Sequence, residues 1–367
     1  MGDDASVIAS NPAAMVLLED EWSMSSGVSA IFPEVEVFGT FDPPAPAPPG
    51  FKMPAIGGNV ANDAAIPYFY IAKRLNEHLV LGFGSYTTVG LETNYPVGFA
   101  ASSLGDFSQL VSFNLNPSLA WQVSEAWSIG VGFDALYADG TLSSSLGGVT
   151  PLLDLAGDDW GYGFNAGVLF KPGANTRLGL HYRSAIDLEL EGRAISSVVP
   201  FFNGPAVLAT ELPDTVEFSA VHDMGAWSLH GDVMWTNWSK FQQLAPVIIG
   251  SPVQPPPTRE DWKDSWRFAL GTTWRATETW TFRAGVAYDN TPVPEGNRTL
   301  RIPDADRLWV TAGFSWDFLP CWTLDVGYAH IFAEDALIIE GSATQGRFTG
   351  RATGGGDVVS VGLSARF

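Results

Sequence analysis

Alternation of apolar residues with small or polar residues, at a period of two, runs through almost the whole 367-residue chain. Between Trp127 and Tyr137 every odd position is apolar or aromatic, whereas the positions between them are mostly Ser, Gly or Asp. Residues 280–288 and 308–316 repeat this pattern. Successive side chains of a β-strand point to opposite faces, so each such segment predicts a strand with one apolar and one small or polar face.

The number of these segments is even, as in single-chain barrels of bacterial outer membranes. We count about fourteen predicted strands, at residues 21–40, 64–74, 77–88, 107–122, 125–144, 159–171, 175–192, 211–223, 225–242, 263–275, 278–290, 304–318, 321–340 and 356–367. The fold class that this predicts is an all-β transmembrane antiparallel β-barrel of about fourteen strands.

The connections between the predicted strands alternate between tight turns and long links. The turns fall at 76–77, 124–125, 173–174, 224–225, 277–278 and 319–320, whereas links such as 41–62 and 246–261 are long and rich in Pro. Short periplasmic turns and long extracellular loops are typical of outer-membrane barrels. A soluble sandwich gives no reason for this alternation.

Aromatic residues mark the ends of the predicted strands. Trp127, Trp227, Trp280 and Trp322 each open a strand just after a short turn, and the chain ends on an amphipathic strand that closes with Phe367. Trp prefers the membrane–water interface, where its ring is half-buried and its N–H stays in water. These residues therefore predict an aromatic girdle at one membrane boundary.

Composition excludes several other classes of protein. No apolar run reaches the ~18 residues of a transmembrane helix. The net charge of −21 opposes binding of nucleic acid. The single Cys321 excludes a disulfide framework. We find neither a His-Glu-x-x-His nor a Gly-x-Ser-x-Gly motif, and we predict no enzyme, no cofactor and no metal.

Residues 1–20 do not follow the strand pattern. They resemble a compact turn-and-helix segment in which Asn11-Pro12 is the breaker. A fourteen-stranded barrel encloses a wide lumen, and the inside of the barrel is the natural place for this segment. We therefore predict two parts: a plug, or hatch, at residues 1–20 and the barrel at residues 21–367.

Several motifs resemble one family of outer-membrane transporters. They are Asp-Asp-Ala-Ser at 3–6, Ser-Asn-Pro-Ala at 10–13, Trp-Thr-Asn-Trp-Ser-Lys-Phe-Gln-Gln-Leu at 235–244, Phe-Ala-Leu-Gly-Thr-Thr at 268–273, and Pro-Val-Pro, Asn-Arg and Ile-Pro-Asp-Ala-Asp-Arg-Leu-Trp within 292–309. In these motifs the chain is similar to FadL-type transporters of long-chain fatty acids and other hydrophobic molecules. The resemblance spans essentially the whole chain.

The resemblance implies a function. A FadL-type protein is a fourteen-stranded barrel plugged by an N-terminal hatch. It carries its cargo passively and releases it laterally into the membrane, which favours hydrophobic molecules because they gain nothing by crossing into water. We accordingly expect a monomer in the bacterial outer membrane, with both termini periplasmic, that contacts outer-membrane lipid and long-chain fatty acid or another hydrophobic small molecule.

The chain departs from the family pattern in three places. The family's hatch begins upstream of the Asp-Asp-Ala-Ser motif, and residues 1–20 lack the basic and apolar stretches of a signal peptide, so we expect the N-terminus to be truncated. The link at 145–158 is short where well-known members carry a helical loop that helps to form an outer substrate groove. A basic residue that some members use near the end of the strand at 125–144 has no counterpart here.

The resemblance and the strand pattern together indicate candidate site residues. For substrate binding we name Arg259, the best candidate for meeting a carboxylate, together with Lys263, Arg267, Arg283 and Trp309. For the hatch we name Asn11, Pro12 and Ala13; for a kink that opens the barrel wall, Thr87, Thr88, Val89 and Gly90. The alternation also places Asp187 and Glu189 on the lumen side.

Three alternatives stay open from the sequence. Neutral cargo, either alkanes or monoaromatic hydrocarbons, would need no counter-charge in a protein with a net charge of −21. An outer-membrane barrel enzyme and a general water-filled porin are the alternatives of a different functional class.

Overall fold

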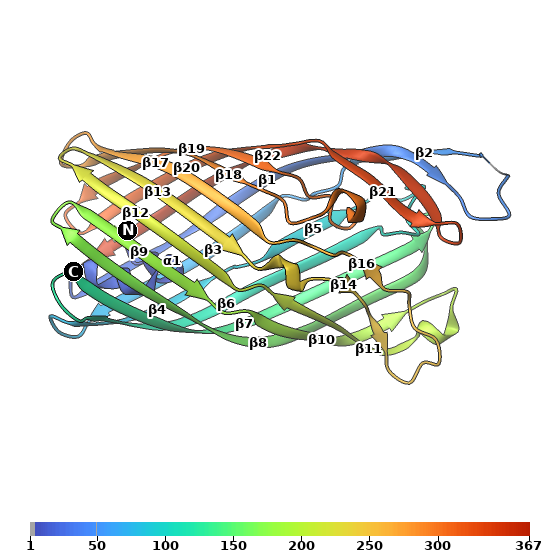
Figure 1. The fold of residues 1–367 in the computed structure, drawn as a ribbon, viewed down its shortest axis with the longest axis horizontal. Coiled ribbons are helices and arrows are strands. Elements are labelled where there is room, and N and C mark those ends of the chain that lie inside the picture. The colour runs from blue at the N-terminus through green and yellow to red at the C-terminus, as the bar shows by residue number, and fades with distance from the viewer. Residues whose placement is uncertain (1–3, 49) are drawn as a thin grey trace.

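Fourteen antiparallel strand positions close into one ring in the computed structural model, which describes residues 4–48 and 50–367 (Figure 1). Residues 1–3 of the predicted hatch and Pro49 lie outside the described residues. In ring order the strands are β1 (Trp22–Asp42), β3 (Ala64–Arg74), β4 (Leu79–Tyr86) with β5 (Gly90–Asn94), β6 (Phe107–Gln122), β7 (Trp127–Leu146), β8 (Thr150–Gly173), β9 (Thr176–Arg183) with β10 (Ile186–Ile195), β12 (Thr215–Met224) with β11 (Gly204–Leu212), β13 (Trp227–Thr236), β17 (Ser265–Arg275), β18 (Trp280–Asp289), β19 (Arg307–Leu319), β20 (Trp322–Ala333) with β21 (Ala336–Ser342), and β22 (Gly346–Arg366).

The barrel closes between its first and last strands. β22 pairs with β1 from Arg366 opposite Ser23 to Arg347 opposite Asp42. The other pairs of neighbouring strands in the ring are also antiparallel, and each strand pairs with the strand position that follows it in the sequence. The predicted fourteen-stranded barrel is confirmed.

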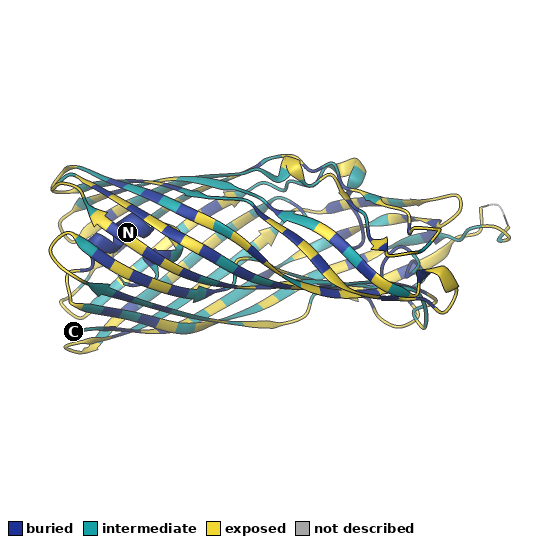
Figure 2. Ribbon diagram, turned by 90° about the horizontal axis from the view of Figure 1, so that it is seen from below, coloured by how far each residue is buried: buried dark blue, intermediate teal, exposed yellow. Residues whose placement is uncertain are grey.

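The outer face of the barrel is apolar. Exposed and buried residues alternate along the strands (Figure 2). Trp127, Trp227 and Trp322 are exposed at the starts of β7, β13 and β20, and Trp280 is half-buried at the start of β18. In a bilayer such a surface is solvated by lipid, and its Trp residues lie where the ring meets the interface.

The described helices are short. They are α1 (Val7–Ser10), η1 (Pro12–Leu17), η2 (Pro200–Phe202), η3 (Trp238–Lys240) and η4 (Glu295–Asn297). None of them is long and apolar enough to span a membrane.

The long links contain more strand than the sequence indicates. β2 (Met53–Asn59) pairs with the outer part of β1 inside the predicted link 41–62. β7 and β8 continue to Leu146 and from Thr150, so that most of the predicted loop 145–158 is a hairpin, and β22 begins at Gly346 rather than near 356. Short strands β14 (Gln243–Leu244), β15 (Val247–Ile248) and β16 (Thr258–Arg259) cross the link after β13. These extensions project at the end of the barrel opposite the two termini (Figure 1).

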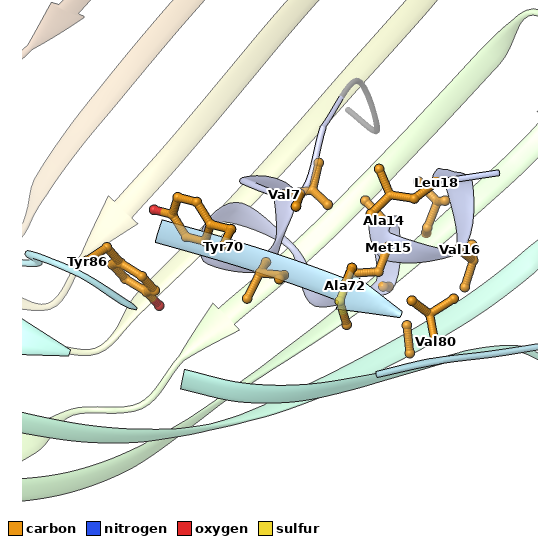
Figure 3. Packing of buried hydrophobic residues seen from close by; sticks show 14 residues of the cluster. Val7, Ala14, Met15, Val16, Leu18, Tyr70, Ala72, Val80 and Tyr86 are labelled. Carbon is orange, nitrogen blue, oxygen red and sulfur yellow. The ribbon is translucent and has the colours of Figure 1, made fainter. Parts of the chain in front are cut away.

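The N-terminal segment, defined here as residues 4–20, packs inside the barrel near the end where the termini lie (Figures 1 and 3). Ala13 and Met15 are fully buried, in one cluster with Tyr70 and Tyr86 of the wall. Glycines allow this close approach. A Cβ on Gly130 would lie 2.3 Å from the backbone nitrogen of Ala13.

Asn11 joins this segment to the barrel wall. Its Oδ1 accepts a hydrogen bond from the backbone N–H of Ala13 at 3.0 Å, which caps η1. Its Nδ2 donates to the carbonyl oxygens of Val168 and Leu180, each at 3.3 Å, on the adjacent strands β8 and β9. A Cβ on Gly167 would lie 2.0 Å from Asn11 Oδ1, so this site on the wall accepts only glycine without rearrangement.

Candidate functional site

One strand position of the wall is interrupted at residues 87–89. β4 ends at Tyr86, β5 begins at Gly90, and the pairing of β3 with the β4 side stops at Phe69 opposite Ser85. The break stays attached to β6, because Ser112 accepts from the Val89 N–H at 2.9 Å and donates its own N–H to the Val89 carbonyl at 3.0 Å. The predicted segment 87–90 therefore contains this interruption.

Gly90 is not the cause of the bend. A Cβ on Gly90 would meet no atom within 4 Å, and its φ is not positive. Neither steric contact nor a positive φ therefore requires a glycine at this position.

An apolar cavity of about 530 Å³ lies next to the interruption, and we call it the outer cavity. Thr88, Val89 and Gly90 line one side of it. About half of its other lining residues are apolar, including Leu110, Leu136, Leu142, Leu190, Leu208, Phe241 and Trp262. Its polar lining includes Arg301, which comes from the link between β18 and β19. The apolar residues suit a hydrophobic molecule, and charged residues of the lining could meet a polar end group; they are Arg183, Glu211, Asp289, Arg301, Asp304 and Arg307.

A larger and more polar cavity of about 800 Å³ lies beside the N-terminal segment, and we call it the inner cavity. Val7, Ser10 and Asn11 line it on one side. The opposite side comes from strands β12 to β22 and carries the charged residues Glu217, Asp232, Arg267, Arg283 and Asp325. The N-terminal segment thus packs on one part of the wall and leaves space along the other.

Arg183 connects the N-terminal segment, the outer cavity and the wall interruption. Its Nη1 donates to Asp134 Oδ1 at 2.6 Å, and its Nη2 donates to the carbonyl of Ala9 at 3.0 Å and to the hydroxyl of Tyr86 at 2.8 Å. Tyr86 is the last residue of β4 before the break, and Arg183 itself lines the outer cavity. The Asp134 carboxylate is fully buried and also accepts from Asn114, Asn116 and Asn165.

Replacing Arg183 by Ala is expected to destabilise the barrel strongly. The change leaves the buried Asp134 carboxylate without its cation, and breaking a buried pair in this way costs roughly 3–5 kcal/mol. Because three Asn donors remain, we expect a loss near the lower end, about 3 kcal/mol. Urea unfolding in detergent, followed by Trp fluorescence, measures it.

Arg275→Ala is the matched control for this prediction. Arg275 pairs with Asp223 at 3.5 Å with its side chain 44% exposed, so its loss should cost under about 1 kcal/mol. Equal losses in the two variants would contradict the role given to Arg183.

Three of the predicted substrate-binding residues gather around the inner cavity. Arg267, Arg283 and Trp309 all line it. The Arg267 guanidinium lies over the Trp309 ring at 5.5 Å from the ring centroid, and Arg283 Nη1 lies 3.9 Å from Asp325 Oδ1.

The other two predicted substrate-binding residues lie at the surface. The Arg259 side chain is 81% exposed and pairs with Asp261, and Lys263 is exposed. Neither residue lines the outer or the inner cavity. The structure thus separates Arg259 and Lys263 from Arg267, Arg283 and Trp309.

Asp187 and Glu189 are exposed, contrary to the prediction that they face the lumen. The strand breaks between Arg183 and Ile186, and side-chain alternation reverses across the break. Before it the odd-numbered Arg183 points inward, and after it the even-numbered Ile186 is the buried residue. A period of two cannot be carried across such a break.

Arg301 is not among the site residues predicted from the sequence. Arg301 as a whole is 92% buried, and its Nη1 donates to the Ser108 hydroxyl at 3.0 Å and the Phe107 carbonyl at 3.3 Å. Within the described part of the chain, no carboxylate forms an ion pair with it. Burial lowers the pKa of Arg301, and the nearby carboxyl groups of Glu340, Asp106 and Glu260 only partly offset this effect. In the sequence Arg301 looks like any solvent-exposed charged residue of a long link, and no local pattern predicts that it is buried.

Two buried carboxyl groups lie near Arg301 in the outer part of the molecule. Burial raises the pKa of Glu260 to about 8 and that of Glu340 to about 7. Glu260 Oε2 accepts from the Trp262 indole N–H at 3.1 Å, and Glu340 Oε2 accepts from the Leu300 N–H at 2.7 Å. At neutral pH Glu260 is mostly uncharged, so it does not neutralise Arg301.

The residues that the structure describes contain no group of three or more His, Cys, Asp or Glu arranged to hold a metal ion. Cys321 is a free, exposed thiol.

Comparison with known proteins gives consistent similarities over the whole chain. The sequence profile described as "Outer membrane protein transport protein (OMPP1/FadL/TodX)" matches residues 1–367. A long-chain fatty acid transport protein of Salmonella typhi is 32% identical over 379 residues, which cover 93% of this chain and 84% of that protein. The protein of the same name from Escherichia coli K12 is 31% identical over 389 residues, covering 93% and 85%.

Solved structures show the same fold. A FadL homologue of Pseudomonas aeruginosa superposes with a TM-score of 0.90 at 22% identity, covering all of this chain and 95% of that one. The toluene transporter TbuX of Ralstonia pickettii gives a TM-score of 0.74 at 18% identity, covering all of this chain and 94% of that one.

Proposed function

Because this chain belongs to the OMPP1/FadL/TodX family of outer membrane transport proteins, we propose that it carries hydrophobic molecules passively across the bacterial outer membrane. The observation that carries this proposal is the apolar outer cavity inside the barrel, next to the interruption at residues 87–89. Hydrophobic cargo favours such a cavity over water, and a gap in the wall lets it leave into the bilayer.

The cargo that we favour is a long-chain fatty acid. The Salmonella typhi and Escherichia coli relatives are named for that cargo. Arg301 supports the choice, because a buried cation without an ion pair at the wall of an apolar cavity suits an anionic head group. The acyl chain would then lie among Leu110, Leu142 and Leu190. Arg259 stays a second candidate for the anchor, although its exposure and its pair with Asp261 favour Arg301.

Fatty-acid binding is expected to weaken as the pH rises from 7 to 9. Glu340, with a pKa of about 7, and Glu260, with a pKa of about 8, both ionise further over this range and add negative charge near Arg301. A carboxylate ligand is then repelled, whereas a fatty alcohol of equal chain length is not. Equilibrium binding of palmitate and palmityl alcohol at both pH values measures the difference.

Glu260→Gln is the control for this pH dependence. The amide cannot ionise, so the loss of palmitate binding above pH 8 should be smaller in this variant. A loss of the same size in Glu260→Gln and the unmodified protein would show that another group is responsible.

The N-terminal segment and residues 87–90 have complementary proposed roles. The segment, with Asn11, Pro12 and Ala13 at its centre, would act as the hatch that blocks free diffusion through the lumen. The interruption would release cargo laterally into membrane lipid. The role as hatch is supported by the hydrogen bonds that join Asn11 to the barrel wall. The role in lateral release is supported by the loss of strand pairing at residues 87–89.

We propose transport by a monomer without catalysis, and three alternatives are separable by experiment. The structural relatives include proteins titled toluene transporters, so neutral hydrocarbons are the nearest alternative cargo. Mass spectrometry of ligand extracted from the purified protein distinguishes fatty acid from hydrocarbon. A steady, large ohmic conductance in planar bilayers would instead indicate a porin, and turnover of an extracted lipid would indicate an enzyme.

A further inference from the structure

A second interruption of the barrel wall lies between β8 and the β9–β10 strand. β8 pairs with β9 up to Asn165 opposite Arg183, and pairs with β10 again only from Asp158 opposite Glu191. Residues 159–164 of β8 therefore face residues 184–190 without ladder pairing between these described residues. Six residues on one side face seven on the other, which makes the register shift by one.

The break crosses two neighbouring strands at the same height. β9 and β12 pair up to Arg183 opposite Thr215, and β10 and β11 resume at Ile186 opposite Leu212. Pro213 lies between them and has no N–H to donate to a ladder. The β10–β11 hairpin is thus joined to the rest of its two strands through unpaired residues, which gives it a hinge.

Side chains close this seam where hydrogen bonds do not. Ile186 is 97% buried and packs from inside onto two glycines of β8. A Cβ on Gly161 would lie 2.3 Å from Ile186 Cγ2, and one on Gly163 would lie 2.8 Å from Ile186 Cγ1. At the ends of the seam, Ser184 donates its N–H to the Phe164 carbonyl at 2.9 Å, and Asp159 Oδ2 accepts from the Glu189 N–H at 2.8 Å.

The seam separates the outer cavity from the lipid-facing surface. On the inside, Ser184, Ile186 and Pro213 line the outer cavity. On the outside, Tyr162 is 63% exposed and lies between the exposed Trp160 and Phe164. The barrier at this point is formed by the packed side chains of Ile186 and Leu188, and no strand ladder reinforces it.

We propose that this seam is a second lateral gate, which opens by movement of the β10–β11 hairpin and passes hydrocarbon chains between the outer cavity and the bilayer. The gate rests on the proposed transport of hydrophobic molecules. It adds a route that is distinct from residues 87–90 and that is closed in this structure by Ile186 on Gly161 and Gly163.

A disulfide across the seam tests the gate. In a Cys321→Ser background, cysteines are placed at Gly161 and Ile186, because a Cβ on Gly161 would lie 2.3 Å from Ile186 Cγ2. In cells without another transporter of this family, we expect the oxidised variant to lose part of its uptake of radiolabelled palmitate and to regain it with a reductant, because the route at residues 87–90 stays open. Thr323→Cys with Ser364→Cys, directly opposite each other on the uninterrupted β20–β22 ladder and outside both cavities, is the matched control.

A second measurement does not depend on cargo. Ile186→Cys should react with a hydrophobic maleimide dissolved in the bilayer faster than Leu110→Cys, which lines the same cavity beside residues 87–90 and away from the seam. Leu169→Cys, buried on a continuous part of β8, should not react. A fully formed 161–186 disulfide with unchanged uptake overturns the second route. Ile186→Cys as unreactive as Leu169→Cys overturns the gate whatever the cargo. If even the unmodified protein takes up neither palmitate nor palmityl alcohol, the proposed transport function is wrong. The maleimide reaction of Ile186→Cys then tests by itself whether the seam opens.

Discussion

Deleting residues 1–20 raises the permeability of the outer membrane to a small polar antibiotic by about tenfold or more, if the N-terminal segment is the hatch of a barrel wide enough to hold an open lumen. The segment fills one side of the lumen with fully buried side chains such as Ile8 and Met15. The inner cavity of about 800 Å³ already lies beside it, so its removal joins that space to the vacated volume. Antibiotic sensitivity of cells that express the variant measures the change.

Asn11→Ala gives the graded comparison for the deletion. It removes the cap on η1 and both donations to the carbonyls of Val168 and Leu180, at a cost of about 0.5–2 kcal/mol for the cap. We expect a smaller rise in permeability than after deletion. A deletion variant that still forms a folded barrel, shown by its heat-dependent gel mobility, and has unchanged permeability would contradict the plug.

Arg301→Ala is expected to weaken palmitate binding by about tenfold to over a hundredfold, which corresponds to the roughly 1.5–3 kcal/mol of a hydrogen bond to a charged group. The guanidinium lines the outer cavity and has no ion pair within the described chain, so a ligand carboxylate would be its counter-ion. Palmityl alcohol should bind almost as well to the variant as to the unmodified protein. Competition with a fluorescent fatty acid, followed in detergent, measures both affinities.

Two comparisons isolate the effect of the Arg301 charge. Arg301→Gln keeps a donor for the Ser108 hydroxyl but removes the charge, and it should weaken palmitate binding as Arg301→Ala does. Arg259→Ala removes a surface residue already paired with Asp261, and it should change binding little. Equal losses of acid and alcohol, or a larger loss in Arg259→Ala, would favour an uncharged cargo or the surface anchor.

The barrel is predictable from the sequence because its strands follow one local rule. Each crosses an environment that is lipid on one side and lumen on the other, so period-two alternation persists in segments such as 127–137. The prediction fails where the backbone leaves that rule. At Ser184–Ala185 the alternation reverses, and Asp187 and Glu189 change sides. The residues on either side of the break contain no pattern that predicts this reversal.

The candidate site is less predictable, because it depends on contacts between distant parts of the chain. Arg267, Arg283 and Trp309 are found from strand alternation, since they lie inside regular strands. Arg301 lies in a link, and its burial depends on packing against β6, more than 190 residues away. A local sequence pattern cannot predict which charged residue of a long link is buried in the folded protein.

The glycine-lined seat of the N-terminal segment has a further consequence. Gly82, Gly130 and Gly167 form a recess in the inner wall that fits one short peptide: the Met15 side chain lies against Gly82, the Ala13 backbone against Gly130 and the Asn11 amide against Gly167. A barrel lacking residues 1–20 keeps that recess, and a synthetic peptide of the segment's sequence is a ligand for it in trans. A competing molecule of the same shape would displace the tethered segment and hold the pore unblocked, which makes this recess a target for sensitising cells to antibiotics.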